Sequence, residues 1–395
     1  MAGPLDGVLV ADFSRVLAGP LCTLNLADLG ATVVKVERPG AGDDTRAWGP
    51  PWSAASSTYF ESVNRSKLSV ALDLSNPGDH ETALELATRA DVLVENYRPG
   101  ALERYGLGFE QVRSVNPGIV YCSITGFGEN EGADLMGYDF VVQAMGGLMS
   151  ITGEPDGQPT KAGVALVDVL TGKDATIGVL AALASRERSG RGCRVQVNLL
   201  SSLLGSLVNQ AQGFLETGEA PGRMGNRHPS IAPYETLRCR DGLLAVACGN
   251  DGQFVRFAAV IGAPGLSADQ RFATNSARVT HRDELVAALE VALAADDADS
   301  WATRLTGAQV PAGKVGTIAD GFALAQRLGL APTVEVGPGH TRQVRQPITY
   351  SPDLVTSPTP PPALGADTGT VRAWLLAKPS GNPLSTLHPT EEVHS

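Results

Sequence analysis

Several common signatures are missing from this chain of 395 residues. It has no Gly-x-Gly-x-x-Gly and no phosphate-loop motif, so the usual signs of nicotinamide and ATP binding are absent. Its five cysteines include no Cys-x-x-Cys pair and its six histidines no His-x-x-x-His pair. This pattern argues against a disulfide framework and a zinc ribbon, and we expect no metal site.

Basic residues are in the minority, and long apolar runs are absent. Lys and Arg number 31 against 42 Asp and Glu, for a net charge of -11, and no basic block or stripe occurs. We therefore expect no nucleic-acid partner. No apolar run reaches membrane-spanning length, so we expect no membrane partner. The chain begins in a strand-like segment without signal-peptide features, which together with the cysteine usage predicts a cytoplasmic location.

What the chain does contain is an alternation of short β-rich runs and helical stretches. The predicted strands are 8–12, 32–36, 91–94, 118–124 and 193–197. Helices are predicted to open at Pro20, Pro77 and Pro99, because proline suits the first helical turn. Such alternation predicts a large Rossmann-like α/β domain with a mostly parallel sheet. Ligands bind such sheets at the carboxyl ends of the strands.

The composition changes near residue 220. Pro and Gly crowd residues 221–233, which resembles a linker. Beyond it, Asp241-Gly242 separates two β-rich runs and predicts a hairpin, and helical segments follow to about residue 328. This part predicts a smaller α+β domain.

One acidic residue, Asp168, ends the apolar run Gly163-Val164-Ala165-Leu166-Val167. Buried acids are rare, and strongly perturbed ones cluster at functional sites. A carboxylate can also attack an activated acyl group and hold it covalently. The alternative is an N-cap, in which the Asp168 side chain satisfies free N–H groups of the helix that follows.

Four arginines lie near predicted strand ends or helix starts, namely Arg15, Arg38, Arg98 and Arg104. Exposed N–H groups at a helix start suit an anion, and a guanidinium fork suits phosphate. A single arginine in such a place is commonly a solvated surface charge. Four in equivalent positions favour a ligand that carries phosphate and adenine.

Taken in order, these stretches resemble the class III CoA-transferases, the CaiB–BaiF family that includes formyl-CoA transferase. The matching segments are Leu5 to Gly7, Asp12 to Pro20, Gly30-Ala31, Lys35 to Gly40, Val94 to Leu102, Gly126 to Gly128, Tyr138-Asp139, Ala165 to Asp168, Gly190 to Gly192 and Gly225 to Pro233. The resemblance covers roughly the first 250 residues. It implies an interlocked-ring homodimer in which residues 1–220 and a returning segment, 326–395, form the large CoA-binding domain. Residues 221–325 then form the small domain.

The resemblance also implies the activity. Asp168 matches the nucleophilic aspartate of enzymes that move CoA between an acyl-CoA and a carboxylic acid through aspartyl anhydride and thioester intermediates. CoA and acyl-CoA are then substrates, and no permanently bound cofactor is expected. The predicted CoA-binding set is Arg15, Val16, Leu17, Ala18, Arg38, Leu72, Asn96, Tyr97, Arg98, Ala101, Arg104 and Tyr105; Arg98 rests on its place at a strand end, the others on the resemblance. Tyr138 and Asp139 match positions that line the acyl site.

Two departures from relatives bear on the reaction. The related α-methylacyl-CoA racemases carry a histidine where this chain has Tyr138, and tyrosine is a poor base at neutral pH because its pKa is about 10. An acyl-CoA racemase or isomerase with Asp168 as general base therefore stays only an alternative. Residues 248–253 lack the glycine run of formyl-CoA transferases, which disfavours formate and oxalate as the substrate pair. A CoA-binding protein without turnover is a further alternative.

Overall fold

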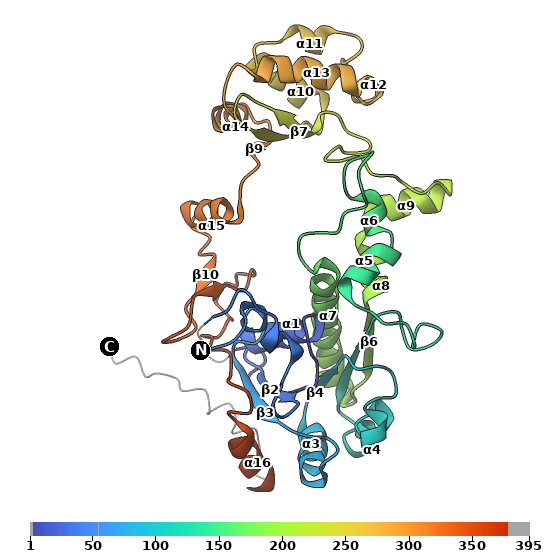
Figure 1. Ribbon diagram of the computed structural model, residues 1–395, viewed down its shortest axis with the longest axis vertical. Coiled ribbons are helices and arrows are strands. Elements are labelled where there is room, and N and C mark those ends of the chain that lie inside the picture. Colours follow the sequence, from blue (N-terminus) through green and yellow to red (C-terminus); the bar gives the residue numbers. More distant parts are fainter. Residues whose placement is uncertain (1–2, 54, 378–395) are drawn as a thin grey trace. The chain divides into compact units, whose positions relative to one another are not determined.

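The protein divides into two compact units, here called the large unit and the small unit (Figure 1). The structure is a computed structural model that describes residues 3–53 and 55–377. The large unit comprises the described residues of 1–146, 162–217 and 331–395, and the small unit comprises 147–161 and 218–330. The placement of 147–161 with the small unit was not indicated by the sequence. The predicted C-terminal segment continues beyond residue 377, where it lies outside the described residues.

A six-stranded parallel sheet in the order β3-β2-β1-β4-β5-β6 forms the centre of the large unit. Its strands are β1 (Leu9–Asp12), β2 (Thr32–Glu37), β3 (Lys67–Ala71), β4 (Val92–Glu95), β5 (Val120–Thr125) and β6 (Arg194–Asn198). Because parallel strands are covered on both faces, β1, β2 and β4 are buried at every position. This confirms the α/β prediction and brings the carboxyl ends of all six strands to one edge.

Helices cover both faces of this sheet (Figure 1). The elements of the large unit outside the sheet are α1 (Ala18–Asp28), η1 (Asp44–Ala47), α2 (Thr58–Glu61), α3 (Pro77–Arg89), η2 (Glu103–Tyr105), α4 (Phe109–Val115), α5 (Asp139–Met145), α7 (Leu166–Ser189), α8 (Leu199–Ser206), α9 (Val208–Thr217), β10 (Thr333–Val334), β11 (Gln343–Val344) and α16 (Thr368–Ala377). Side chains of α3, α4 and α16 share one apolar core with the sheet. Helices α1 and α7 pack against each other and against strands of the sheet.

In the large unit one predicted helix is absent, and one strand was not predicted. The helix expected to open at Pro99 is absent, because Gly100 takes φ 80° and the chain turns before the short 3-10 helix η2. Strand β3 was not predicted, since its polar residues interrupt the apolar pattern. The predicted helix from Pro77 to Arg89 is confirmed, with Asn76 as its N-cap.

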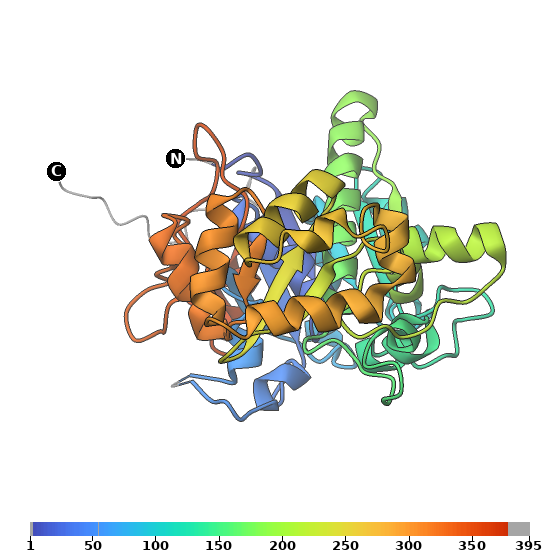
Figure 2. The ribbon, with the colours of Figure 1, turned by 90° about the horizontal axis from the view of Figure 1, so that it is seen from above.

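The small unit is built on a three-stranded antiparallel sheet in the order β7-β8-β9. Its elements are α6 (Leu148–Ile151), β7 (Tyr234–Arg238), β8 (Leu243–Ala247), α10 (Asp251–Val260), α11 (Gly265–Ala268), α12 (Asn275–Thr280), α13 (Arg282–Leu293), α14 (Ala298–Gly307), β9 (Ala312–Lys314) and α15 (Ile318–Arg327). The predicted hairpin around Asp241-Gly242 is confirmed as β7 and β8. Helices α10, α13 and α14 pack their apolar residues on the sheet, and Figure 2 shows them as yellow and orange ribbons around its strands.

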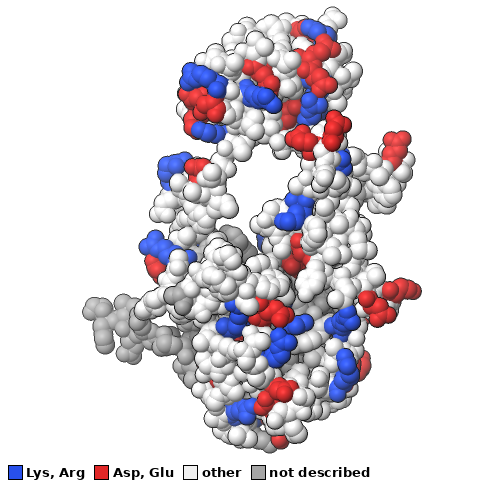
Figure 3. All heavy atoms as spheres, viewed as in Figure 1, with Lys and Arg blue, Asp and Glu red and all other residues white. Residues whose placement is uncertain are grey.

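The charged side chains are intermixed. Figure 3 shows acidic and basic groups side by side on the face drawn. Within the described residues, every helix is too short or too polar to span a bilayer.

Candidate active site

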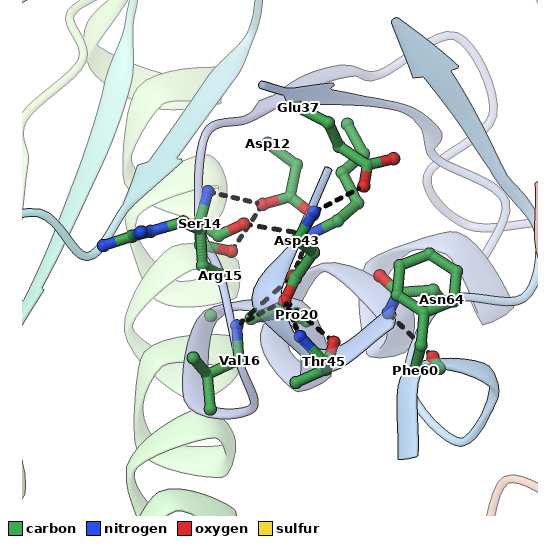
Figure 4. A network of polar contacts seen from close by, with 12 residues as sticks. Asp12, Ser14, Arg15, Val16, Pro20, Glu37, Asp43, Thr45, Phe60 and Asn64 are labelled. Atoms are coloured by element: carbon green, nitrogen blue, oxygen red, sulfur yellow. Dashed lines mark hydrogen bonds and ion pairs between the residues drawn. The ribbon is translucent and has the colours of Figure 1, made fainter. Parts of the chain in front are cut away.

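The loop 13–17, which connects β1 to α1, is held in place by polar contacts from three other segments. Figure 4 shows the contact that Asp43 makes with Val16. The Arg15 N–H donates to Asn96 Oδ1 at 2.8 Å, and Asn96 Nδ2 donates to the Arg15 carbonyl at 2.7 Å. The Val16 N–H donates to the Asp43 carboxylate at 3.2 Å. Val16 has φ 69°, which is strained for a β-branched residue and persists only where surrounding contacts impose it. The sequence therefore builds a rigid turn directly before the first turn of α1.

Two buried ion pairs lie beneath this loop. Lys67 Nζ is 3.1 Å from Asp12 Oδ2, and Lys35 Nζ is 2.9 Å from Asp43 Oδ2, with all four side chains fully buried. Burial opposes ionisation of Asp12, but Lys67 and Lys35 together hold its pKa below the usual value. Burial lowers the pKa of Lys67 to about 8, although Asp12 opposes this shift. Buried charges are stable only when they are paired, so these two ion pairs fix the position of the residues on which the loop packs.

A cavity of about 190 Å³ opens where this loop, the end of β5 and the start of α7 meet. Nine predicted site residues line it: Arg15, Val16, Leu17, Ala18, Asn96, Tyr97, Arg98, Tyr138 and Asp168. The fold thus brings together residues from four separate stretches of the chain. Among the described residues that line the cavity, none is a histidine.

Asp168 is the third residue of α7 and is partly buried. Within the described part of the chain, its carboxylate accepts no hydrogen bond, so the N-cap interpretation of Asp168 is wrong; Ala165 occupies the N-cap position. Burial, and second to it the nearby negative charge of Asp139, together raise the pKa of Asp168 to about 7. The carboxylate is therefore only about half ionised at neutral pH, rather than fully ionised as an unperturbed aspartate would be.

Tyr138 and Asp139 are adjacent but face different surroundings. Tyr138 lines the cavity and is half exposed. Asp139 is buried and does not line the cavity; its Oδ1 accepts the Val167 N–H at 2.7 Å and the Asp168 N–H at 3.3 Å. Its other oxygen accepts from Gln143 Nε2 at 2.7 Å. Asp139 therefore contacts the backbone that carries Asp168.

A second, smaller cavity adjoins the first through Arg15 and Tyr97, which line both. Arg38 lines this second cavity. The Asp44 carboxylate lies between Arg15 at 3.3 Å and Arg38 at 3.2 Å, and the Arg15 guanidinium lies over the Tyr97 ring, 5.1 Å from its centroid. Arg15 Nε is buried and has no hydrogen-bond partner among the described residues. Two guanidinium groups therefore line this second cavity, both paired with Asp44, and an incoming phosphate would compete with that carboxylate for them.

The remaining predicted CoA contacts lie elsewhere in the large unit. Leu72 is part of the main apolar core, and Tyr105 packs against it. Ala101, Arg104 and Tyr105 line neither cavity.

The loop 126–137 contributes much of the cavity wall and was not predicted as a site. A Cβ added to Gly126 would lie 2.6 Å from the Gly137 Cα, so the two ends of the loop touch and only glycine fits at each. Leu135 and Met136 line the cavity and are exposed. The segment Gly126 to Gly128 was visible in the sequence, but its contact with Gly137 was not. The described residues include no cluster of His, Cys, Asp and Glu suited to hold a metal ion.

Comparison with known proteins is consistent with this geometry. The chain matches CoA-transferase family III over residues 5–368. It is 42% identical to the succinyl-CoA:glutarate CoA-transferase of Mus musculus, over 92% of this chain and 85% of that protein. It is also 42% identical to the succinate–glutarate CoA-transferase of Agrobacterium fabrum, over 94% of this chain and 96% of that one. A crystal structure of a CaiB/BaiF family protein from Brucella suis superposes with a TM-score of 0.86 at 42% identity, covering 95% of this chain and 100% of the other. The chain therefore belongs to the class III CoA-transferases and is an enzyme of that family.

Proposed function

We propose that this enzyme moves CoA between an acyl-CoA and a carboxylic acid through covalent intermediates on Asp168. The observation that carries the proposal is the Asp168 carboxylate itself. It shares one cavity with Arg15, Asn96 and Tyr97 and accepts no hydrogen bond from any described residue. A carboxylate without such partners keeps its lone pairs available for attack on an acyl group.

The proposed reaction proceeds in balanced steps. A carboxylate oxygen of Asp168 attacks the thioester carbonyl, the C–S bond breaks, and an aspartyl–acyl anhydride and CoA thiolate form. The thiolate attacks the aspartyl carbonyl of the anhydride, the C–O bond to the donor breaks, and the donor acid leaves as a carboxylate. An aspartyl–CoA thioester remains. The acceptor carboxylate then attacks this thioester and forms a new anhydride, and the returning thiolate takes the acceptor's acyl group and frees Asp168. The thioester bond energy is conserved because water takes no part.

The two cavities support the binding of CoA. Arg15 and Arg38 both pair with the Asp44 carboxylate. A phosphate group could take the place of this carboxylate between the two guanidinium groups. The Arg15 guanidinium lies over the Tyr97 ring, which helps to hold this cation at the cavity wall. We keep Leu72, Ala101, Arg104 and Tyr105 as predicted CoA contacts, although they line neither cavity. Tyr138 is proposed to face the acyl group.

We propose dicarboxylic acids as the substrate class, with succinyl-CoA as donor and glutarate as acceptor to be tested first. The names of the two relatives from Mus musculus and Agrobacterium fabrum, which both include glutarate, support this choice. The cavity also contains cations that suit a second carboxylate, since Arg15 and Arg98 both line it.

We also propose that two copies form the interlocked homodimer implied by the resemblance, with domains 1–220, 221–325 and 326–395 as predicted. Exposed apolar side chains support a partner: α9 buries none of its residues and exposes Phe214 and Leu215, and α5 exposes Phe140 and Met145. Light scattering should give twice the mass of the chain. Tagged and untagged dimers mixed in native buffer should exchange no subunits, whereas rapid exchange would contradict interlocking.

Trapping the intermediate tests the reaction. The full-length protein is mixed with succinyl-CoA and hydroxylamine, which converts an activated aspartyl carbonyl into a hydroxamate, and peptides are mapped by mass. We expect the hydroxamate on Asp168 in the wild type and in the control Asp174→Ala, which changes an exposed aspartate of the same helix. Asp168→Ala should show neither label nor transfer of CoA to glutarate. Transfer by Asp168→Ala at the wild-type rate would refute the covalent route.

A further inference from the structure

The first turn of α7, which carries Asp168, is tied to α5 by two side chains. Asp139 Oδ1 accepts the N–H groups of Val167 and Asp168 at 2.7 and 3.3 Å. Gln143, one turn further along α5 and fully buried, donates to Asp139 Oδ2 at 2.7 Å. Its carbonyl oxygen accepts the Ala162 N–H at 2.9 Å, so the same glutamine also fixes the segment that enters α7.

These contacts replace a cap that the helix does not supply for itself. The N-cap residue of α7 is Ala165, whose side chain cannot accept a hydrogen bond. A helix N-terminus leaves its first N–H groups without partners, and a cap normally satisfies those of the second and third residues. Val167 and Asp168 are the second and third residues of α7. Asp139 thus acts as their cap from 29 positions away in sequence.

We infer that Asp139, held by Gln143, is the positioning residue that fixes the direction of the Asp168 side chain and keeps the N–H groups of α7 from pairing with it. This inference rests on the proposed role of Asp168 as nucleophile. It also gives Asp139 a different role from the lining of the acyl site, since both of its oxygens are occupied within the protein.

The electrostatic surroundings agree with this role. Burial is the largest cause of the raised pKa of Asp168, and the negative charge of Asp139 is the second. Asp168 also acts on Tyr59 of α2, whose pKa it helps to raise, and Tyr138, Arg15 and Arg98 line the same cavity as Asp168. A change at Asp139 therefore alters both the direction and the charge of the nucleophile.

Two variants separate these effects. Asp139→Asn removes the charge, and its amide then faces the amide of Gln143. This clash of two donors displaces the side chain at position 139, so that its remaining oxygen caps the Val167 N–H less well. The double variant Asp139→Asn with Gln143→Glu restores the pairing, because the carboxylate introduced at position 143 accepts both from the amide introduced at position 139 and from the Ala162 N–H. The negative charge then sits on position 143, one helical turn along α5 from position 139.

The test measures the rate of hydroxamate formation on Asp168 from succinyl-CoA between pH 5.5 and 9, with folding checked by circular dichroism. For Asp139→Asn we expect a rate at pH 8 reduced roughly tenfold by misplacement of the nucleophile. We also expect the acid limb of its pH–rate profile, where the rate falls as Asp168 becomes protonated, to move to lower pH by roughly half to one unit. The double variant should recover most of the rate while its acid limb stays displaced. An unchanged rate and an unchanged limb in Asp139→Asn would overturn the inference.

Hydrogen exchange of the peptide that spans residues 162–170 gives a readout that needs no turnover. Asp139→Asn should accelerate exchange of the amides of Val167 and Asp168 roughly fivefold, as loss of a cap predicts. The double variant should restore their protection. Unchanged exchange in Asp139→Asn would overturn the positioning role even if the wild type forms the adduct. Absence of the adduct from the wild type would instead refute the covalent function.

Discussion

The raised pKa of Asp168 predicts that acyl transfer to the enzyme depends steeply on pH in a range where an ordinary aspartate would show no effect. With a pKa of about 7, about nine-tenths of Asp168 is ionised at pH 8 and about one-tenth at pH 6. Since only the carboxylate attacks, kcat/KM for succinyl-CoA should fall about ninefold to tenfold between these values. An unperturbed aspartate is ionised throughout this range and predicts a flat profile.

The assay is the initial rate of Asp168 labelling at succinyl-CoA concentrations below KM, because kcat/KM reports the ionisation of the free enzyme. A second buried carboxyl needs a control, since burial also raises the pKa of Glu95 to about 7. Glu95→Gln keeps an oxygen that can accept the Tyr97 N–H, so we expect its acid limb to coincide with that of the wild type. A profile flat to pH 5.5, or a limb that moves with Glu95→Gln, would refute the reasoning.

The same elevation predicts an effect on stability. Each pKa unit corresponds to about 1.4 kcal/mol, so raising the pKa of Asp168 from 3.8 to about 7 costs the folded state up to about 4 kcal/mol. The folded state holds this proton more tightly than the unfolded chain. The cost is therefore absent below about pH 4, grows as the pH rises to 7, and is constant above. Asp168→Asn should stabilise the protein in urea unfolding, by up to about 3 kcal/mol more at pH 8 than at pH 5; an equal effect at both pH values would contradict a raised pKa.

Three further substitutions probe the surroundings of the site. Arg15→Gln removes a cavity cation and should raise the Kd for CoA by roughly tenfold to a hundredfold in calorimetry, whereas Arg113→Gln, which changes an exposed cation on α4, should leave it unchanged. Gly172→Ala places a Cβ 2.7 Å from a carbonyl oxygen of α1, so chemical unfolding should show a loss of about 1–3 kcal/mol, and no loss would mean that α1 and α7 are loosely packed. Lys67→Met leaves the buried Asp12 carboxylate without its ion pair and should cost about 3–5 kcal/mol; a neutral result in the same assay would show that the pair does not hold the loop.

The sequence predicted elements whose signals are local. Pro77 and the N-cap Asn76 mark the start of α3, where a helix was predicted to open. Strand β3 could not be predicted in this way, because it begins with a buried lysine and contains Ser69, which donates to Glu37 at 2.6 Å. Such polar residues are buried only because their partners come from neighbouring strands, and a pattern along one segment does not contain that information.

The residues of the candidate site likewise include some that the sequence indicated and some that only the tertiary structure identifies. The sequence singled out Asp168 and the loop that follows β1, and the fold brings both to one cavity. It did not indicate Gln143, because a glutamine within a helical pattern carries no signal of its own. It also suggested Asp168 as an N-cap, since an aspartate near a helix start fits that role. The cap is instead an aspartate 29 residues earlier in the chain, a long-range contact that only the tertiary structure reveals.

That exchange of roles explains how a carboxylate at a helix N-terminus can serve as a nucleophile. Free N–H groups and the helix dipole would ordinarily stabilise the anion, lower its pKa and weaken its attack. At the start of α7 the N–H groups of Val167 and Asp168 are already occupied by Asp139, which also adds a repelling charge. A more basic carboxylate is a stronger nucleophile, and at a pKa of about 7 it is still substantially ionised at neutral pH. The chemistry proposed for Asp168 thus depends on a pair of aspartates, in which one satisfies the helix so that the other remains free to react.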